Sequence, residues 1–295
     1  YEASLSASLN YDEAYYLKHQ ALATVLGLMA MVVAANIPYH FWERFAVLGY
    51  IVSAILILLV LSPLGIEANG ARRWLNLGLS VQPAEVAKLC MILFLASFIC
   101  KMGKGIRSPK GFWIVLMMPV PICVMIWQIT NNLSSAIIIF GIAFLMLFVA
   151  SPSYKRFIVL GTVGVAAAAA LVFVILQMDS SSLDFRGNRI LAWLNPEDYA
   201  SGTGFQTLQA LYAIGSGGIF GKGLGQSIQK LGFVPEAQND MIFSIICEEL
   251  GLFGGVAVIL LFVLLIWRFM IIANNASDLF GALLVVGVMG HIAIQ

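Results

Sequence analysis

The chain has 295 residues, of which 61% are hydrophobic and 11% charged, and its formal net charge is +1. Soluble domains carry about 25% charged residues, so this composition excludes an ordinary soluble domain and indicates an integral membrane protein. The basic residues lie in short loops and not on one face, which argues against a nucleic-acid partner. The four cysteines sit in apolar runs without CxxC spacing, and we interpret them as small apolar fillers.

Apolar runs long enough to cross a bilayer recur along the chain. A helix needs about 20 residues to cross a hydrocarbon core of about 30 Å. Because backbone polar groups must be satisfied internally in lipid, continuous apolar runs predict helices and not barrel strands. We therefore expect an all-α, polytopic transmembrane bundle. The predicted spans are residues 21–36, 46–62, 83–100, 112–130, 133–150, 157–177, 241–270 and 281–295.

These spans are expected to form a single integral membrane domain, residues 1–295, that lacks at least one helix at each end. Residues 1–20 resemble an external arm. Residues 178–239 form a long segment that is too apolar in places to be a floating linker, so we expect a large extracellular loop with short interfacial helices.

Basic residues in the connecting loops predict the orientation. The stretch CKMGKGIRSPKG, the stretch SPSYKRF and Arg268 fall on the same side when the helices are counted. The positive-inside rule makes this side cytoplasmic. The long segment 178–239 and the loop GIEANGARRWLNLGLSVQP then face outward, and we expect any chemistry to lie there.

The stretch NGARRWLNLGLSVQPAEVAKL is the first candidate constellation on the outer side. Pro83 suits the first turn of a helix, where its missing N–H costs little. Glu85 and Lys88 are spaced i, i+3 on one helical face and can form an ion pair at the membrane edge. A structural ion pair with interfacial anchors is the alternative. The anchor candidates are Arg72, Arg73 and Trp74.

The glycine-rich loop GSGGIFGKGLG, residues 215–225, lacks the GxGxxG spacing of a dinucleotide site. Its backbone N–H groups are expected to approach an anionic head group, and the alternative is a flexible loop with incidental glycines. Cationic help would come from Arg186, Arg189, Lys222 and Lys230. In the polar turn QITNNLSSA, Asn131 and Asn132 are interpreted first as turn formers.

The stretch PEAQNDMIFSIICEELG, residues 235–251, contains acidic residues in an otherwise apolar segment. Asp240 is expected in the first turn of its helix, where the helix dipole favours a negative charge, and an N-terminal cap is the alternative. On an ideal helix Glu248 lies about 12 Å deeper than Asp240, and Glu249 points away from it. One of these two carboxylates would face a cavity at Asp240, or both would form structural ion pairs.

The motifs GARRWLNLG…QPAEVAKL, RGNRILAWLNPEDYASGTGFQ and GFQTLQALYAIGSGGIFGKGLGQSIQKLGFVPEAQNDMIFSIICEELGLFG together closely resemble the SEDS family of bacterial cell-wall synthases. The stretch GLGQSIQK is more similar to the division and sporulation branch, FtsW and SpoVE, than to the elongation member RodA. The resemblance covers essentially the whole chain. It implies a ten-helix peptidoglycan glycosyltransferase of the cytoplasmic membrane that polymerises lipid II on the outer face, with about eight helices represented here.

The resemblance assigns the family's essential aspartate to Asp240 as the catalytic residue. It also implies substrate-binding and supporting roles for other positions. The substrate-binding candidates are Arg72, Arg73, Trp74, Gln82, Glu85, Lys88, Gln206, Lys222, Lys230 and Glu236. The supporting candidates are Asn132, Gln238, Asn239, Glu248 and Glu249.

Two positions depart from the family pattern. Gln238 and Asn239 stand where the family usually has His-Thr, so no histidine role carries over. Asn132 stands where many members have an acidic residue, which weakens an electrostatic or metal-binding role, although an amide carbonyl still coordinates metals.

The chemistry of the residues agrees with the implied reaction. Joining two sugars at the expense of a pyrophosphate needs a base for the acceptor hydroxyl and cations for the leaving phosphates. Asp240 is the candidate base, and Arg73, Lys88 and a divalent cation such as Mg²⁺ or Mn²⁺ are candidates for the leaving group. Glu85 would hold Lys88 or the metal. A single base suits direct displacement with inversion.

Two other function classes stay open from the sequence. A lipid II flippase would use the same polar cavity, the kink-prone Pro119 and Pro121 and a relay at Glu248, although no internal repeat supports it. The second of these classes is a noncatalytic scaffold for a partner synthase. The resemblance further implies a class B penicillin-binding protein as partner, within a divisome or sporulation complex in the membrane lipid.

Overall fold

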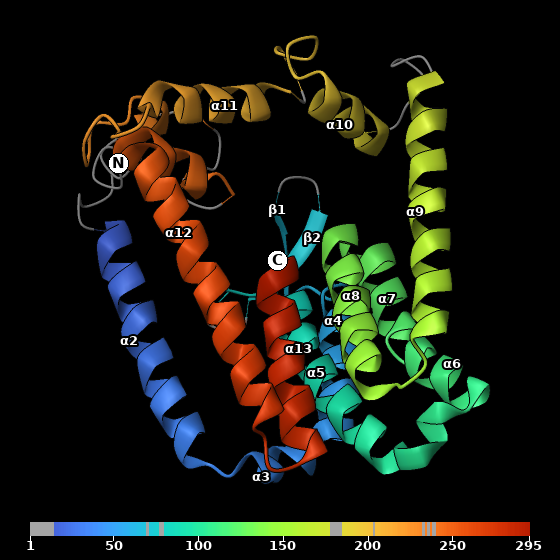
Figure 1. Cartoon of the computed structure of the whole chain (residues 1–295). Coiled ribbons are helices and arrows are strands. Elements are labelled where there is room, and N and C mark those ends of the chain that lie inside the picture. The colour runs from blue at the N-terminus through green and yellow to red at the C-terminus, as the bar shows by residue number, and fades with distance from the viewer. Residues whose placement is uncertain are drawn as a thin grey trace. The chain divides into compact units, whose positions relative to one another are not determined.

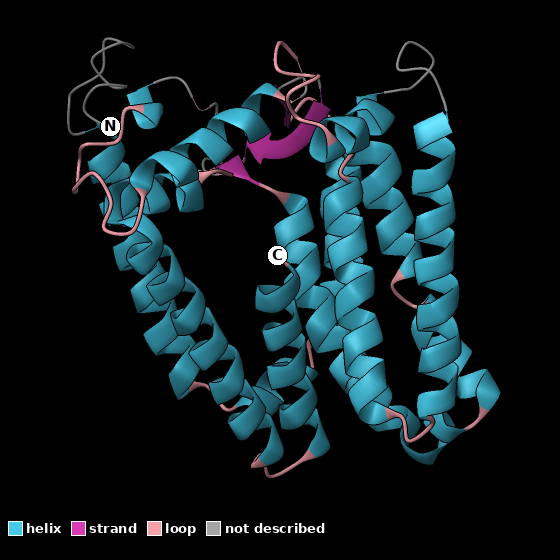
Figure 2. Ribbon diagram, turned by 45° about the horizontal axis from the view of Figure 1, so that its top comes forward, coloured by secondary structure: helices cyan, strands magenta, loops and turns pink. Residues whose placement is uncertain are grey.

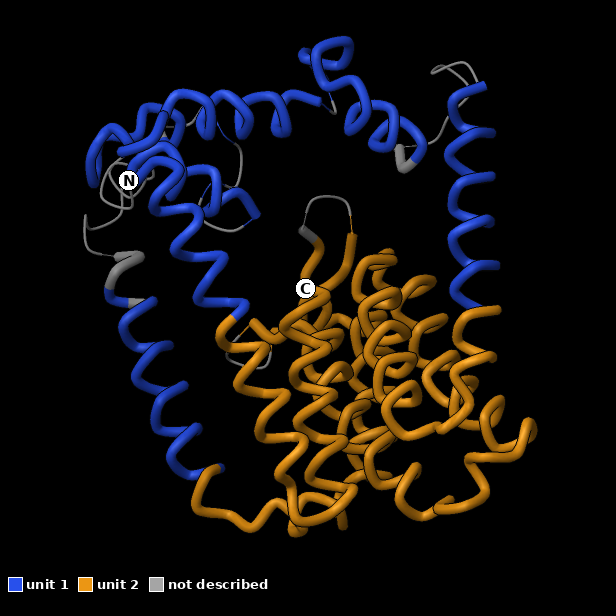
Figure 3. The backbone as a smooth tube through the Cα atoms, viewed as in Figure 1, with its two compact units in different colours: residues 1–34, 160–263 blue, residues 35–159, 264–295 orange. Residues whose placement is uncertain are grey.

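The computed structural model describes residues 15–68, 71–76, 80–177, 185–202, 204–231, 234, 237 and 240–295. The chain divides into two compact units (Figure 3). Unit 1 comprises residues 1–34 and 160–263, and unit 2 comprises residues 35–159 and 264–295. Each unit is described by itself. The expectation of a single membrane domain stays a prediction.

Unit 2 contains most of the packed helices and the small sheet (Figure 1). Its helices and strands, in chain order, are α3 (Tyr39–Glu43), α4 (Ala46–Leu59), β1 (Gly65–Ala68), β2 (Ala71–Asn76), β3 (Ser80–Val81), α5 (Pro83–Met102), the 3₁₀ helix η1 (Gly103–Arg107), α6 (Pro109–Met117), α7 (Val120–Thr130), α8 (Leu133–Ala150) and α13 (Leu279–Ile294).

Helix α5 is the centre of unit 2, because it packs against α4, α8 and α13, and α13 also packs against α8. The core between these helices is apolar. Leu95 of α5, Met146 of α8 and Leu283 of α13 are each completely buried. Pro83 occupies the first turn of α5, as the sequence predicts. This core fixes the N-terminal end of α5, which carries the candidate residues Glu85 and Lys88.

A small antiparallel sheet, in the order β1-β2-β3, replaces the loop that was expected over residues 65–81 (Figure 2). Gly65 pairs with Leu75, and Leu75 also pairs with Val81. Leu75 is completely buried, whereas Arg72 and Asn76 are exposed. The Asn-Gly pair between β1 and β2 is a standard hairpin signal, from which this turn could have been predicted.

Unit 1 holds the residues of the long segment and of the helix that follows it. The elements with residues in this unit are α2 (Tyr15–Asn36), α9 (Tyr154–Gln177), α10 (Phe185–Leu194), α11 (Phe205–Gly217), the 3₁₀ helix η3 (Gln229–Leu231) and α12 (Ile242–Asn274). Helices α2, α9 and α12 continue into residues of unit 2. Short helices therefore lie within residues 178–239, and their location at a membrane surface stays a prediction.

The predicted helices are confirmed, with small changes at their ends. Among the described residues, five helical segments are long and apolar enough to cross a membrane: 83–107, 109–130, 133–150, 154–177 and 242–274. Shorter apolar helices cover 20–36, 46–59 and 279–294. The span predicted at 112–130 is divided into α6 and α7 at Pro119, because proline removes a helical hydrogen bond. The chain is a multi-pass membrane protein.

Candidate functional site

The predicted site residues divide between the two units. Unit 2 carries Arg72, Arg73, Trp74, Gln82, Glu85, Lys88 and Asn132, and unit 1 carries Gln206, Lys222, Lys230, Asp240, Glu248 and Glu249. Three predicted residues, Glu236, Gln238 and Asn239, lie outside the described residues.

Arg73 joins two of the predicted constellations of unit 2. From β2 its Nε donates to the carbonyl oxygen of Thr130 at 3.3 Å, and its Nη2 donates to the carbonyl oxygen of Asn131 at 3.4 Å. Cations favour the carbonyl end of a helix, here that of α7. Arg73 is half-buried and has five N–H donors, so these bonds leave donors available for a ligand.

The asparagine turn between α7 and α8 forms as the sequence predicts. Asn131 ends α7 in the left-handed conformation, with φ 50°, a conformation that asparagine tolerates better than most residues. The Oδ1 of Asn132 accepts a hydrogen bond from the N–H of Ser135 at 3.1 Å. Asn132 is therefore the N-cap of α8, and its supporting role at the site stays a prediction.

Arg72 and Trp74 are both exposed on strand β2. The Nε of Arg72 lies 3.6 Å from Oε2 of Glu67, and both side chains are about half exposed. Trp74 is 38% exposed. Arg72 and Trp74 are therefore accessible to a ligand on the exposed side of β2, whereas Arg73 contacts the end of α7.

The predicted ion pair of Glu85 and Lys88 is present at the start of α5. The Nζ of Lys88 lies 2.8 Å from Oε1 of Glu85 and donates to Oε1 of Gln295 at 3.0 Å. The Lys88 side chain is only 1% exposed, whereas that of Glu85 is 44% exposed. Lys88 is thus enclosed. Of the two paired side chains, only Glu85 is accessible at the surface. Gln82 is the N-cap residue of α5 and makes no side-chain cap bond.

Two residues near this ion pair, His291 of α13 and its C-cap residue Gln295, were not predicted. Gln295 accepts from Lys88. His291, one helical turn earlier, is close enough to Lys88 and Glu85 to interact electrostatically with both. Among the described residues, its Nδ1 is buried without a hydrogen-bond partner. An ionisable residue in an apolar span is a standard signal of a site, so His291 could have been selected from the sequence.

Asp240 lies in a turn before α12 and is exposed. The helix begins at Ile242, so the expectation that Asp240 occupies its first turn is wrong, and the ideal-helix projection from Asp240 to Glu248 does not apply. Among the described residues the Asp240 carboxylate neither caps the helix nor forms an ion pair. In this respect it differs from Glu85, Glu248 and Glu249, each of which pairs with a lysine.

Glu248 is completely buried and is surrounded by donors from the segment that precedes α12. Its Oε1 lies 2.7 Å from Nζ of Lys222 and accepts from the N–H of Ile228 at 3.3 Å. Its Oε2 accepts from the hydroxyl of Ser227. Because charge and hydrogen bonds are both compensated, the burial of this carboxylate is tolerated.

Glu249 makes a parallel set of contacts with the same segment. Its Oε1 lies 2.7 Å from Nζ of Lys230 and accepts from the N–H of Ser227 at 3.3 Å. The structural alternative for the two glutamates is therefore present: both pair with lysines of residues 222–230. Lys222 and Lys230 are engaged by these carboxylates, and their contact with a substrate stays a prediction, as does that of Gln206 in α11.

Helix α12 is interrupted at Gly251, and backbone groups of the glycine-rich loop replace the helical hydrogen bonds that are lost there. Gly251 has φ 69° and ψ −166°, which interrupts the helix. In a regular helix the N–H of Leu252 would donate to the carbonyl oxygen of Glu248. Here Leu252 donates to the carbonyl oxygen of Gly218 at 2.9 Å, and Glu248 accepts from the N–H of Lys222 at 2.9 Å.

The next residue of α12 repeats this exchange. Phe253 donates to the carbonyl oxygen of Ile219 at 3.2 Å, and the carbonyl oxygen of Glu249 accepts from the N–H of Gly223 at 2.9 Å. The N–H groups of Lys222 and Gly223 are therefore used inside the protein. The expectation that these N–H groups approach an anionic head group is wrong, because α12 supplies their acceptors.

Across the described residues, no group of three or more His, Cys, Asp and Glu side chains is arranged to hold a metal ion. Among the described residues, Glu67 pairs with an arginine, Glu85, Glu248 and Glu249 pair with lysines, and Asp240 forms no ion pair. A divalent cation held by protein side chains alone does not fit this part of the chain.

Comparison with known proteins identifies the family of this chain. The family described as cell cycle protein, FtsW/RodA/SpoVE, matches residues 1–295. Stage V sporulation protein E of Bacillus subtilis (strain 168) is 38% identical over 292 residues, which are 98% of this chain and 78% of that protein. A probable peptidoglycan glycosyltransferase FtsW of Geobacter metallireducens is 37% identical, over 97% of this chain and 74% of that protein.

Solved structures agree with the fold. A chain from work described as structural coordination of polymerization and crosslinking by a peptidoglycan synthase complex matches with a TM-score of 0.73 and 25% identity, over 93% of this chain and 75% of that chain. The rod shape determining protein RodA of Thermus thermophilus matches with a TM-score of 0.60 and 24% identity, over 98% of this chain and 76% of that chain. The latter likeness shows the fold alone.

Proposed function

Since the chain belongs to the FtsW/RodA/SpoVE family of cell cycle proteins, we infer that it is a peptidoglycan glycosyltransferase, and we propose that it polymerises lipid II with Asp240 as the general base. The match over the whole chain to relatives named as peptidoglycan glycosyltransferases carries this inference. The choice of Asp240 is supported by its exposure and by the absence of a paired cation among the described residues.

In the proposed reaction, the Asp240 carboxylate takes the proton of the acceptor hydroxyl. The hydroxyl oxygen forms a new bond to the anomeric carbon of the donor sugar. The bond from that carbon to the pyrophosphate oxygen breaks, and the lipid pyrophosphate leaves with the electron pair. A paired carboxylate such as Glu248 is a poorer base for this step, because its lone pairs already accept hydrogen bonds from lysine, serine and backbone groups.

We assign the phosphates of the substrate to Arg72 and Arg73. Arginine binds phosphate with two parallel hydrogen bonds, and Arg72 is accessible on β2. The enclosure of Lys88 supports a positioning role for this residue in place of direct phosphate contact, since its ammonium group holds the half-exposed Glu85.

A divalent cation stays a proposal for this reaction. Mg²⁺ commonly binds one or two carboxylates together with substrate phosphates and keeps several waters, so it does not require a preformed cluster of protein ligands. No step above depends on it. Polymerisation measured with EDTA and then with added Mg²⁺ or Mn²⁺ tests this requirement directly.

We further propose that the chain acts with a class B penicillin-binding protein, in division or sporulation, and that Asp240 faces the outer side of the membrane. The likeness to a chain of a peptidoglycan synthase complex supports the partner. The similarity to SpoVE and FtsW supports the cellular role. The basic loops between α5 and α6 and between α8 and α9 support the orientation.

The experiment uses full-length protein with its penicillin-binding partner and labelled lipid II, and it measures glycan chains on a gel. Asp240→Asn is expected to reduce polymer formation at least about 100-fold, within the range that general-base catalysis contributes. Asp198→Asn is the matched control, because Asp198 is an exposed aspartate of the same unit. Polymer formation by Asp240→Asn at the wild-type rate would contradict the assignment. Movement of lipid II across vesicles without polymer would instead favour a flippase.

A further inference from the structure

Two loops at one end of unit 2 concentrate positive charge. Residues 101–110 and 151–156 contain six basic side chains and no acidic one. The positive-inside rule explains a general excess of basic residues in such loops. It does not require that any of them line a cavity.

Two of these basic residues nevertheless line a cavity of about 330 Å³. This volume is at the lower end of the range for small-molecule sites, about 300–1,000 Å³. Lys104 and Arg107 of η1 are its cations, and both are exposed. The buried side chains of Ile99 and Ile106 also line it. The cavity thus combines positive charge with an apolar wall.

The side chains of Lys104 and Arg107 make no ion pair or hydrogen bond with the described residues. The backbone that carries them is, by contrast, held in place. The Nη1 of Arg156 donates to the carbonyl oxygen of Ser108 at 3.3 Å, and its Nη2 donates to the carbonyl oxygen of Arg107 at 3.2 Å. The guanidinium carbon of Arg156 also lies 5.4 Å from the ring centre of Phe112. Arg156 therefore fixes the loop, and the charges of Lys104 and Arg107 are left for a ligand.

Exposed apolar residues continue the cavity wall. Val149, near the end of α8, is 50% exposed, and Leu279, at the start of α13, is 49% exposed. Ser151 is buried at the cavity and brings a hydroxyl group, which is both a donor and an acceptor. A ligand that fits must therefore be anionic at one end and apolar at the other.

We propose that this cavity binds the head group of an anionic phospholipid of the surrounding membrane. The phosphate contacts Lys104 and Arg107, and the first part of the acyl chains covers Val149 and Leu279. Basic pockets between transmembrane helices on the cytoplasmic side are a known mode of recognition for anionic lipid head groups. This proposal is independent of the catalytic role of Asp240.

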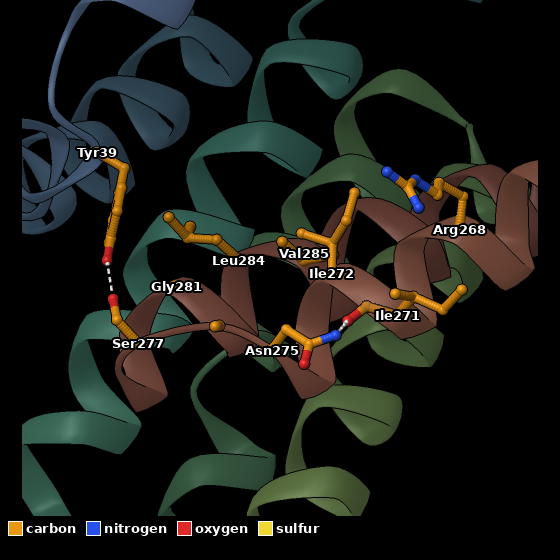
Figure 4. A pocket seen from close by; sticks show the side chains of 10 residues that line it. Tyr39, Arg268, Ile271, Ile272, Asn275, Ser277, Gly281, Leu284 and Val285 are labelled. Carbon is orange, nitrogen blue, oxygen red and sulfur yellow. Dashed lines mark hydrogen bonds between the residues drawn. The ribbon is translucent and has the colours of Figure 1, made fainter.

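A larger cavity of about 560 Å³ in unit 2 does not fit this ligand equally well (Figure 4). Arg268 is its single basic residue, and Ile271, Ile272, Leu284 and Val285 form much of its wall. The complementarity to an anionic head group is therefore stronger at the smaller cavity, which two cations, Lys104 and Arg107, line.

The test measures one-to-one lipid adducts of the purified full-length protein by native mass spectrometry. Phosphatidylglycerol is compared with phosphatidylethanolamine. The pocket variant is Lys104→Gln/Arg107→Gln. The matched control is Lys101→Gln/Lys110→Gln, which removes the same charge from exposed residues of the same segment that do not line the cavity.

The wild type and the control are expected to retain one phosphatidylglycerol in preference to phosphatidylethanolamine. The pocket variant should bind it about 25-fold more weakly, since each basic residue near an anionic lipid surface contributes about fivefold in the binding constant. Recovery of binding in Lys104→Arg/Arg107→Lys would support recognition by charge at these positions, and it also shows that the cavity is folded.

Three results would overturn the proposal. Equal losses in the pocket variant and the control would show a diffuse basic surface in place of a site. Equal retention of the two lipids by the wild type would remove the head-group selectivity. Displacement of the lipid by millimolar inorganic phosphate alone would show that the cavity recognises free phosphate and not a membrane lipid.

Discussion

The Nζ atom of Lys222 lies 2.7 Å from Oε1 of Glu248, which has no exposed surface, while the Lys222 side chain is 31% exposed. Loss of one partner therefore has a different cost for each of the two side chains. An unpaired lysine at this position keeps partial access to water. An unpaired carboxylate at Glu248 stays buried, with only hydrogen bonds to offset its charge.

We therefore expect Lys222→Met to lower the free energy of unfolding by about 3 kcal/mol, the lower end of the cost of breaking a buried pair. The double variant Lys222→Met/Glu248→Gln should be more stable than Lys222→Met, because it also removes the uncompensated charge. Thermal unfolding of the full-length protein in detergent gives the order of stability. A double variant less stable than Lys222→Met would contradict this account.

The break in α12 makes a second prediction about stability. Gly251 has φ 69°, and a Cβ atom there would clash with the backbone of Ile219 and Gly221. Gly251→Ala should therefore destabilise the contact between the glycine-rich loop and α12 by several kcal/mol, since strain and a backbone clash add. Gly215→Ala is the control, because nothing lies within 4 Å of a Cβ atom at this helical position. It should be neutral or stabilising by up to about 1 kcal/mol.

Unfolding temperatures of the two glycine variants provide the measurement. Hydrogen exchange of the Leu252 and Phe253 amides is a second readout, because these N–H groups donate to the loop. Faster exchange in Gly251→Ala than in Gly215→Ala is expected. Equal exchange in the two variants would show that the loop does not depend on this close approach.

The sequence predicted the helices well because the signal is repeated over many residues. Residues 133–150 were predicted with both ends correct, since an apolar run is bounded there by Asn132 and Ser151. The sheet at residues 65–81 was missed because its strands are only 4, 6 and 2 residues long, too short for a clear alternating pattern. The Asn-Gly pair was the single sequence signal that indicated a hairpin in place of a loop.

The partners of the site residues were harder to predict than their identities. The pair of Glu85 and Lys88 follows from local spacing on one helix. The partners of Glu248 and Glu249 lie 19 to 26 residues earlier in the chain, and no helical periodicity connects them. The break at Gly251 is likewise set by contacts with the glycine-rich loop, so a projection along an ideal helix could not represent it.

The enclosure of Lys88 leads to a prediction about how Glu85 acts. If Lys88 serves to hold Glu85, Glu85→Gln and Lys88→Met should each slow polymerisation of lipid II by a similar factor. The double variant should then be no slower than the slower single variant, because residues that act as a unit are not additive. Conversely, multiplied losses in the double variant would show that the two side chains act independently on the substrate.

The same cycle is measured at several concentrations of Mg²⁺, because Glu85 is also a candidate metal ligand. A metal role predicts that Glu85→Gln raises the Mg²⁺ concentration needed for half-maximal activity, and that Lys88→Met does not. Equal Mg²⁺ dependence in both variants is the outcome expected from the ion pair. The Arg107→Gln variant serves as a control, since this residue belongs to the separate basic cavity.

Asp278 provides the prediction about pH. It is the N-cap of α13: its Oδ1 accepts from the N–H of Gly281 at 2.6 Å, and its Oδ2 lies 2.8 Å from both the hydroxyl of Tyr39 and Nε2 of His40. The Gly281 N–H, followed by Tyr39 and His40, holds the pKa of Asp278 below its usual value. A carboxyl group whose pKa is lower in the folded state stabilises the fold above its unfolded pKa, about 3.9. This contribution is lost as the pH falls through the folded pKa.

Asp278→Asn keeps a capping side chain and removes the charge, whereas Asp278→Ala removes both. At pH 7 we expect Asp278→Ala to be destabilised by about 1 kcal/mol, typical of a lost N-cap, and Asp278→Asn by less. The gap in unfolding temperature between wild type and Asp278→Asn should shrink as the pH is lowered below about 4, because the carboxyl group of the unfolded chain then takes up a proton more readily than that of the folded protein, whose pKa is lower. A gap that stays constant across this range would show that hydrogen bonding to Gly281, and not the charge of Asp278, stabilises the start of α13.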